Sequence, residues 1–119
     1  MFPIQDSRGR VIGFGGRALG DGNPKYINSP DTVLFDKGRS LFNMHRAAPR
    51  ARIESRVVVV EGYVDTIAFD TARIPEVVAP NGTALTEHQL ELLWRLGADP
   101  IICMDGDAPG KKAAFRAAV

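Results

Sequence analysis

A chain of 119 residues with 45% hydrophobic residues can form one hydrophobic core but not two, and its formal net charge is close to zero at +1. The single cysteine, Cys103, excludes a disulfide within the chain, and His45 and His88 stand at no zinc-binding spacing. No signal peptide is evident and no apolar run is long enough to span a membrane, so a reducing cytoplasm is the expected compartment.

The charge is unevenly distributed along the chain. Residues 1–56 contain ten Lys or Arg and five Asp or Glu, whereas residues 57–119 contain five and nine. A basic segment attracts polyanions, and an acidic site needs cations. Both ends of the sequence look cut, because it opens on a strand-like segment and closes within an expected helix, so we expect a piece of a larger protein.

The basic half is expected to begin with an antiparallel hairpin, since two strand-like segments, 2–5 and 11–14, flank a turn-rich link. The stretch 15–30 is rich in Gly, Asn and Pro and is predicted to be mostly loop, and 37–48 is compatible with a short helix. We interpret residues 1–56 as part of a basic α+β subdomain.

The acidic half, residues 57–119, is expected to alternate strands with helices. The strands are predicted over 57–60, 76–79 and 100–104, and the helices over 64–72, 86–96 and 111–119. Runs of Val and Ile without polar alternation are typical of strands covered on both faces, as in a parallel sheet. The predicted fold class is therefore α/β, with a parallel sheet flanked by helices and preceded by the basic subdomain.

The helix expected over 86–96 has the clearest signals. Thr86 and Gln89 form a capping box, and Gly97 suits the C-terminal cap. Trp94 belongs to the apolar stripe of this helix and is predicted to lie in the core. Cys103 lies in an expected core strand, where a buried inert thiol is the usual state.

Acidic residues follow two of the expected strands. Glu61 comes directly after the first, and Asp105 and Asp107 follow the third, with Gly106 between them to let the backbone bend. Open parallel sheets bind ligands at the carboxyl ends of their strands, so these carboxylates should converge. Such crowding favours a cation, usually Mg²⁺. The alternative is an acidic turn in which Asp107 caps a helix and Glu61 pairs with a buried Arg or Lys.

Three further features have two interpretations each. Asp65, one turn after Glu61, is either a further metal ligand or a solvated acid at a helix start. The glycine-rich stretch 13–16 fits neither the dinucleotide nor the P-loop spacing, so a strand-end turn is favoured. The stretch 80–83 precedes a helix at the same sheet edge and either contacts phosphate or is a plain turn.

The basic half contains side chains that suit a nucleic acid. Cations, an aromatic ring and an amide can contact the phosphates, bases and sugars of a single strand, although a solvated basic surface would have the same composition. These residues are Arg17, Lys25, Tyr26, Asn28, Lys37 and Arg39.

Two acidic segments resemble the signatures of the Toprim domain, which primases, topoisomerases and some nucleases share. Glu61-Gly62-Tyr63-Val64-Asp65 resembles the first signature, and Asp105-Gly106-Asp107 resembles the second. The segments 15–17, 25–30, 35–42 and 81–86 are similar in order and spacing to the polymerase domain of bacterial DnaG-type primases. The resemblance spans nearly the whole chain, and its Toprim part corresponds to residues 57–119.

This resemblance implies an enzyme that makes short RNA primers on a DNA template by metal-dependent nucleotidyl transfer, with Mg²⁺ or Mn²⁺ as cofactor. It implies an acidic metal-binding centre of Glu61, Asp105 and Asp107, with Asp65 assisting. It also implies a basic groove for template and nucleoside triphosphates, lined by Arg17, Lys25, Tyr26, Asn28 and Lys37. The family's other partners would be the RNA primer and a replicative helicase, which binds through a region absent here, at a cytoplasmic replication fork.

The family's zinc-binding module, a later acidic segment, the remaining strand of the Toprim sheet and the helicase-binding tail have no counterpart in the sequence. We therefore expect this chain alone to bind metal but not to make primers. One alternative is a piece of a Toprim nuclease or topoisomerase, against which the primase-like first half argues. Another is a non-catalytic nucleic-acid-binding module. Its DNA binding would be weakened by Lys25→Ala or Lys37→Ala and would be unaffected by changes at Asp105.

Overall fold

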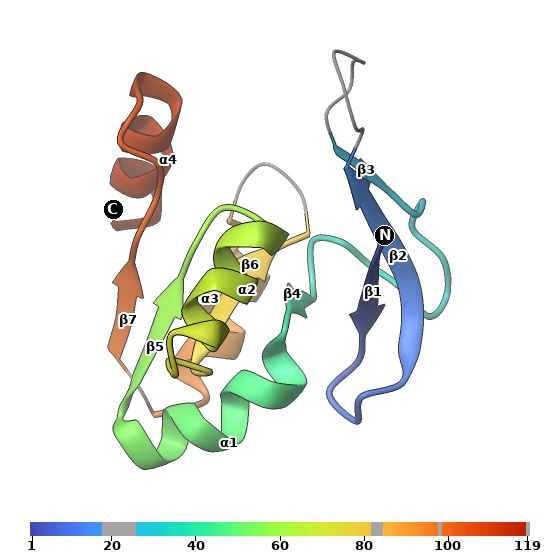
Figure 1. Cartoon of the computed structure of the whole chain (residues 1–119), viewed down its shortest axis with the longest axis horizontal. Coiled ribbons are helices and arrows are strands. Elements are labelled where there is room, and N and C mark those ends of the chain that lie inside the picture. Colours follow the sequence, from blue (N-terminus) through green and yellow to red (C-terminus); the bar gives the residue numbers. More distant parts are fainter. Residues whose placement is uncertain (18–25, 82–84, 98, 119) are drawn as a thin grey trace.

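The computed structural model describes residues 1–17, 26–81, 85–97 and 99–118, and its strands form two sheets (Figure 1). The first sheet is antiparallel in the order β1-β2-β3, which are β1 (Phe2–Gln5), β2 (Val11–Arg17) and β3 (Tyr26–Asn28). The pairing of β1 with β2 confirms the hairpin expected at the start of the chain.

The second sheet has the order β4-β6-β5-β7, with β4 (Leu41–Phe42), β5 (Arg56–Val59), β6 (Val77–Pro80) and β7 (Asp99–Ile102). Strand β5 is parallel to both neighbours, whereas the short β4 is antiparallel to β6. The described helices are α1 (Met44–Glu54), α2 (Tyr63–Thr71), α3 (Glu87–Trp94) and α4 (Ala108–Ala118). None of them is long and apolar enough to cross a membrane. The predicted α/β class is confirmed.

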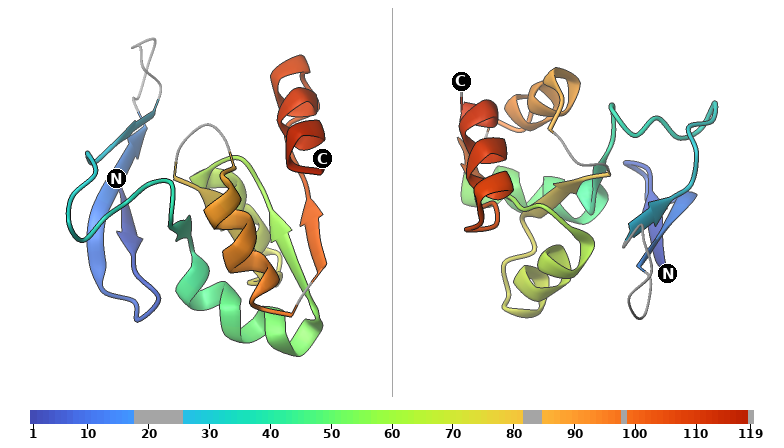
Figure 2. Two further views of the ribbon diagram at one scale, coloured as in Figure 1. Left: turned by 180° about the vertical axis from the view of Figure 1, so that it is seen from behind. Right: turned by 90° about the horizontal axis from the view of Figure 1, so that it is seen from above.

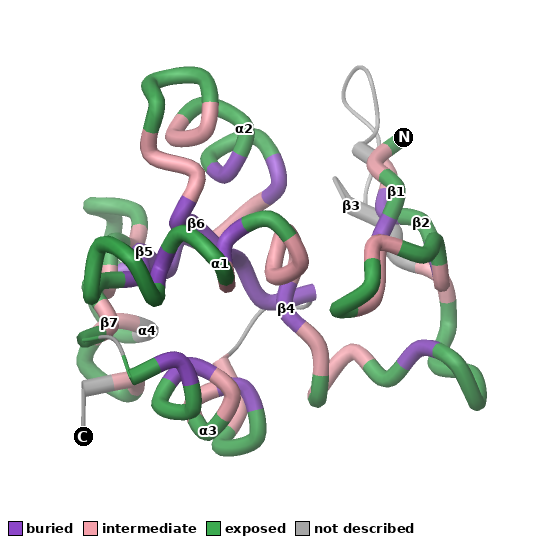
Figure 3. Tube along the Cα trace, turned by 90° about the horizontal axis from the view of Figure 1, so that it is seen from below, coloured by how far each residue is buried: buried purple, intermediate pink, exposed green. Residues whose placement is uncertain are grey.

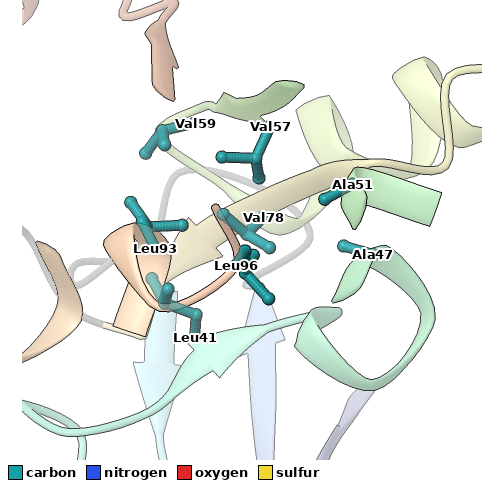
Figure 4. Packing of buried hydrophobic residues seen from close by; sticks show 8 residues of the cluster. All are labelled: Leu41, Ala47, Ala51, Val57, Val59, Val78, Leu93 and Leu96. Atoms are coloured by element: carbon teal, nitrogen blue, oxygen red, sulfur yellow. The ribbon is translucent and has the colours of Figure 1, made fainter. Parts of the chain in front are cut away.

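The valines of β5 are buried on both faces of the sheet, as a run without polar alternation predicts. Val57 and Val59 pack with residues of α1 and α3, whereas Val58 and Val60 pack with residues of the face that α2 covers. Helices α2 and α3 lie on opposite sides of β5 and β6 (Figure 2), and both strands are buried (Figure 3). Figure 4 shows the larger of the two clusters. Each buried valine stabilises the fold by about 1.5 kcal/mol.

Strand β7 differs from the expectation of a strand covered on both faces. Its side chains alternate between exposed and intermediate, and Ile101 is 48% exposed (Figure 3). Among the described strands it pairs with β5 alone, so it forms an edge of the sheet. Cys103, which follows the strand and was expected to be buried, is exposed for the same reason.

Helix α3 confirms its predicted capping box and corrects the placement of Trp94. The Thr86 side chain accepts a hydrogen bond from the Gln89 amide, and the Gln89 side chain accepts one from the Thr86 amide. Gln89 and Leu93 define the buried face of the helix, with Leu96 just beyond its end. Trp94 follows Leu93 by about 100° of helical rotation, so its side chain points outward and is 63% exposed.

Two segments of the basic half are more ordered than the sequence predicts. Within 15–30, the expected loop is wrong at 15–17, where β2 continues, and at 26–28, which form β3, while residues 18–25 of the expected loop lie outside the described residues. The glycines of 13–16 are part of β2 rather than of a turn. Glycine is a poor strand former, so this pairing leaves little trace in the sequence.

A short helix was predicted over 37–48. The observed helix, α1, begins only at Met44 and continues to Glu54. Contacts with distant parts of the chain prevent an earlier start. Leu41 and Phe42 pair with β6, and Asn43 adopts a left-handed conformation while its side-chain amide donates to the Val77 carbonyl at 2.9 Å. These long-range hydrogen bonds outweigh local helix preference.

Candidate metal centre

Glu61 and Asp105 meet at the carboxyl edge of the second sheet. Strands β5 and β7 run in parallel with Val59 opposite Ile102, so the loops that follow them leave the sheet side by side. The Cys103 amide donates to the Val59 carbonyl at 2.8 Å, which extends this alignment into the loop. The Asp105 amide then donates to Glu61 Oε1 at 3.3 Å. Parallel pairing therefore joins two acids that are 44 residues apart.

The carboxyl of Glu61 lies in an electrostatically crowded place. Its pKa is raised above the usual 4.5, first by partial removal from water and then by the neighbouring Asp105 side chain, with the negative charge of Asp107 adding to the effect. The Asp105 amide hydrogen bond opposes this rise. In the part of the chain that the structure describes, no Lys or Arg forms an ion pair with these three acids. The alternative in which Glu61 pairs with a buried cation therefore finds no support there.

Asp107 caps the helix that follows it. Its Oδ1 accepts a hydrogen bond from the Gly110 amide at 2.7 Å, in the first turn of α4. This contact uses one carboxylate oxygen, and the negative charge of Asp107 still raises the pKa of Glu61. Capping and cation binding are therefore compatible roles for Asp107.

Asp65 is not among the groups that raise the pKa of Glu61. It is exposed in the first turn of α2, where the helix dipole stabilises a negative charge. Across residues 1–17, 26–81, 85–97 and 99–118, no three His, Cys, Asp or Glu side chains are close enough together to hold a metal ion. Two carboxylates, Glu61 and Asp105, are thus adjacent, and Asp107 is close enough for its charge to raise the pKa of Glu61.

The donor set suits a hard divalent cation. Carboxylate oxygens are the ligands that Mg²⁺ prefers, and this ion keeps several waters, so it needs only one or two protein carboxylates. The like charges that raise the pKa of Glu61 would be relieved by a cation. The residues present therefore fit such an ion.

Gly110 is a positioning residue that sequence reasoning missed. A Cβ at this position would overlap the carbonyl oxygen of Asp105 and lie 2.7 Å from its carbonyl carbon, so only glycine lets α4 start against the Asp105 backbone. The sequence offered little signal for this role, because Gly110 stands one residue before the helix expected over 111–119. Gly106 was expected to let the backbone bend between the two aspartates. A Cβ added at Gly106 would have no atom within 4 Å, and its φ is not positive. The tight approach occurs at Gly110 instead.

The basic segment around Lys37 is held by helix α3. The Gln89 side-chain amide donates to the carbonyl oxygens of Lys37 and Ser40 at 2.9 and 2.8 Å, and Gln89 is only 1% exposed. The Lys37 amide donates to Asp31 Oδ1 at 3.0 Å. Arg39 is engaged in an exposed ion pair with Asp36 at 3.5 Å. The capping residue of α3 therefore also fixes the backbone of the Lys37 loop.

The remaining predicted nucleic-acid residues are described in part. Arg17 ends β2, and Tyr26 and Asn28 lie in β3, where Arg17 pairs with Tyr26 and Gly15 with Asn28. Lys25 lies outside the described residues, as do 82–84 of the predicted phosphate-contacting stretch. In that stretch, Asn81 is buried and its amide donates to the Ser40 hydroxyl at 2.9 Å, which is a structural contact.

The raised pKa of Glu61 predicts a pH dependence of stability. The folded state holds the proton of this carboxyl more tightly than the unfolded state, so stability is gained as the pH falls through the folded pKa, and the ionised form costs stability at neutral pH. Glu61→Gln should therefore stabilise the metal-free chain at pH 7, by less than about 1 kcal/mol for a partly exposed charge, and lose this advantage near pH 4. Urea unfolding at both pH values measures this.

The matched control is Glu91→Gln, which removes an exposed charge from α3. It should leave the free energy of unfolding within about 0.5 kcal/mol of the wild-type value, as for other surface substitutions. A Glu61→Gln variant that is less stable than the wild type at pH 7 would contradict the electrostatic crowding described above.

Two family models match the chain. The DNA primase catalytic core, N-terminal domain, matches residues 1–48, and the Toprim domain matches residues 55–119. The second match covers more than half of the chain, so the chain belongs to the Toprim family. Toprim domains in primases bind metal ions in general, which agrees with the donor set at Glu61 and Asp105.

Within that family its relatives are DNA primases. The DNA primase of Pseudomonas aeruginosa is 50% identical over 117 residues, which are 98% of this chain but 18% of that primase. The crystal structure of a DNA primase domain from P. aeruginosa matches 98% of this chain and 36% of its own, with a TM-score of 0.92 and 50% identity. A DnaG primase catalytic domain bound to single-stranded DNA matches with a TM-score of 0.87 and 48% identity, over 98% of this chain and 37% of its own. The chain thus spans about a fifth of the length of the curated primases.

Proposed function

We propose that this chain is the part of a DNA primase catalytic core that provides the metal-binding acids and one side of the nucleic-acid groove. The reaction is DNA-templated synthesis of short RNA primers by nucleotidyl transfer. The observation that supports this most strongly is the contact between the Asp105 amide and Glu61, which brings two acids of different strand ends together in a family of primases. The substrates are single-stranded DNA, nucleoside triphosphates and the growing RNA primer, and the helicase partner binds elsewhere in the full primase.

In this proposal Glu61, Asp105 and Asp107 hold Mg²⁺ or Mn²⁺, and Asp65 assists from the start of α2. A bound divalent cation supplies positive charge for the attacking and leaving oxygens of phosphoryl transfer. The chain's own contribution is to hold the carboxylates close together and correctly oriented. The Asp105 amide hydrogen bond orients Glu61, and the cap on Gly110 orients Asp107.

The basic groove is proposed to consist of Arg17, Lys25, Tyr26, Asn28, Lys37 and Arg39. Its support is the register of β2 and β3, which brings the backbone of Arg17 beside that of Tyr26, and the fixed backbone of Lys37. The similar DnaG primase catalytic domain has a solved structure with single-stranded DNA bound, which makes a single strand the first ligand to test here. The division between a basic subdomain (1–56) and a Toprim domain (57–119) is also a proposal. Strand β4 belongs to the second sheet and α1 packs on it, so part of 1–56 shares the core of the second unit.

Lys37→Ala is expected to weaken binding of single-stranded DNA by roughly threefold to tenfold and to reduce the slope of log affinity against log salt by about 0.7, the value for one phosphate contact on a single strand. Fluorescence anisotropy with a labelled oligonucleotide at several salt concentrations measures both quantities. Arg52→Ala, an exposed cation on α1, is the control and should leave the affinity within about twofold. Equal losses for both variants would show that binding responds to net charge rather than to a groove at Lys37.

Primer synthesis itself is tested by placing the chain in a complete enzyme. We expect a P. aeruginosa primase whose matching segment is replaced by this chain to make primers on single-stranded DNA. Asp105→Asn in that chimera should reduce synthesis at least about 100-fold, because the charge that holds the metal is removed. A folded, DNA-binding chimera that makes no primers, or one that makes them equally well with Asp105→Asn, would refute the proposed function.

A further inference from the structure

Tyr63 is a side chain that contacts strands of both sheets. None of the strands of the first sheet packs extensively against an element of the second. Tyr63, only 4% exposed at the start of α2, nevertheless contacts both. Its ring stacks on Phe2 of β1 with centroids 5.2 Å apart and meets the ring of Phe42 of β4 edge-on at 4.6 Å.

The third neighbour of the ring is the backbone of β2. A Cβ on Gly15 would lie 2.6 Å from Tyr63 Cε2 and 2.8 Å from Cζ, so the ring is seated directly on this glycine. Gly15 is the register partner of Phe2, and the ring therefore covers a paired position of β1 and β2. Burial of the hydroxyl end raises the pKa of Tyr63 to about 12, as expected for a phenol withdrawn from water.

The position of Tyr63 in the chain gives this contact a functional meaning. It lies two residues after Glu61, in the turn that leads from β5 into α2. On the other side, Gly15 is opposite Asn28 and two residues before Arg17. One ring thus separates the strand pair that carries proposed nucleic-acid residues from the loop that carries the proposed metal ligand.

We propose that Tyr63 is a positioning residue that fixes the distance between the β2–β3 strands and the Glu61–Asp105 carboxylates. This inference rests on the proposed function for its purpose, but the mechanical contact can be tested without it. The Tyr63 ring is buried directly against the backbone of Gly15. Because close-packed interiors have low compressibility, a movement of that backbone displaces the ring. A shift of β2 at Gly15 therefore moves Tyr63 and, through the short turn, Glu61.

The test compares two alanine substitutions on the same strand. Gly15→Ala places a methyl group against Tyr63, whereas the atoms nearest to a Cβ at Gly13 belong to Phe35 and Ser29, with Phe35 Cδ2 at 3.0 Å. In amide NMR spectra of the metal-free chain, Gly15→Ala should shift the signals of Glu61 and Asp105, and Gly13→Ala should leave them in place. In a Mn²⁺ titration, Gly15→Ala should weaken affinity roughly tenfold, the effect typical of residues that orient metal ligands, and Gly13→Ala less than about twofold.

Two substitutions of Tyr63 itself test the same contact if the Gly15→Ala variant does not fold. Tyr63→Phe keeps the ring and should lose less Mn²⁺ affinity than Tyr63→Leu, which removes the ring and should lose roughly tenfold. Circular dichroism establishes that each variant is folded. Equal effects of Gly15→Ala and Gly13→Ala, or wild-type behaviour of Tyr63→Leu, would overturn the inference. A wild-type chain that binds no Mn²⁺ would instead contradict the proposed function, and the amide shifts of the metal-free chain would still decide the role of Tyr63.

Discussion

Asp105→Asn is expected to weaken Mn²⁺ binding by this chain at least about 100-fold, since even residues that only orient metal ligands cost 10-fold to 100-fold when changed. Asparagine keeps the size of the side chain and the backbone amide that donates to Glu61, so the local geometry is preserved. What is lost is one of the two adjacent negative charges. Isothermal titration calorimetry at low ionic strength measures the affinity directly.

Asp99→Asn is the matched control for this prediction. Asp99 begins β7, the strand that leads to Asp105, and is exposed at the opposite end of the strand. The two variants have the same net charge, so a general loss of attraction for cations would affect both equally. We expect Asp99→Asn to retain affinity within about twofold, as screened charges at this distance allow. Equal losses would mean that Mn²⁺ binds through the overall charge of the chain.

Gly110→Ala should destabilise the chain by about 2 kcal/mol, as expected for overpacking against atoms that cannot move aside. In an ordinary helix the same substitution gains about 1 kcal/mol, so the predicted sign is reversed. The reason is that the new methyl group would overlap the Asp105 backbone carbonyl, which the first turn of α4 approaches. Because Asp105 must move, Mn²⁺ affinity should also fall, by roughly tenfold or more. Thermal unfolding and Mn²⁺ titration measure the two effects.

Gly106→Ala tests the same loop without the clash. No atom lies within 4 Å of a Cβ at Gly106, and its φ is not in the left-handed region. We therefore expect a change in unfolding free energy within about 0.5 kcal/mol, as for surface substitutions without special contacts. If Gly106→Ala proved as damaging as Gly110→Ala, flexibility of the acidic loop would matter rather than the approach of α4 to Asp105.

The second half of the fold was predictable because its signals are local. The sequence of β5 contains a run of valines buried on both faces, and Thr86 and Gln89 form a capping box. Each of these structures depends on a few adjacent residues and can be recognised from them. The meeting of Glu61 and Asp105 also followed from the sequence, because parallel strands end at the same edge.

The features that were missed depend on contacts between distant residues. Strand β3 is defined by its pairing with the glycines of β2, which have weak strand preference. Trp94 belongs to an apolar stripe, but the buried face of α3 is set by Gln89, whose amide binds the Lys37 loop. Gly110 is required by a backbone that lies outside its own helix. None of these contacts has a fixed sequence spacing from which it could be inferred.

The most direct test of the central claim, that the acids of two strand ends form one metal centre, is a titration of the wild-type chain with Mn²⁺ followed by amide NMR. The paramagnetic ion broadens signals of nearby residues. We predict that broadening begins at Glu61, Gly62 and Asp105 to Asp107 at substoichiometric Mn²⁺ and that excess Mg²⁺ reverses it. Broadening spread evenly over exposed acids such as Asp31, Glu87 and Asp99, or absent from the Glu61 loop, would show that the carboxylates do not form a metal centre in this chain.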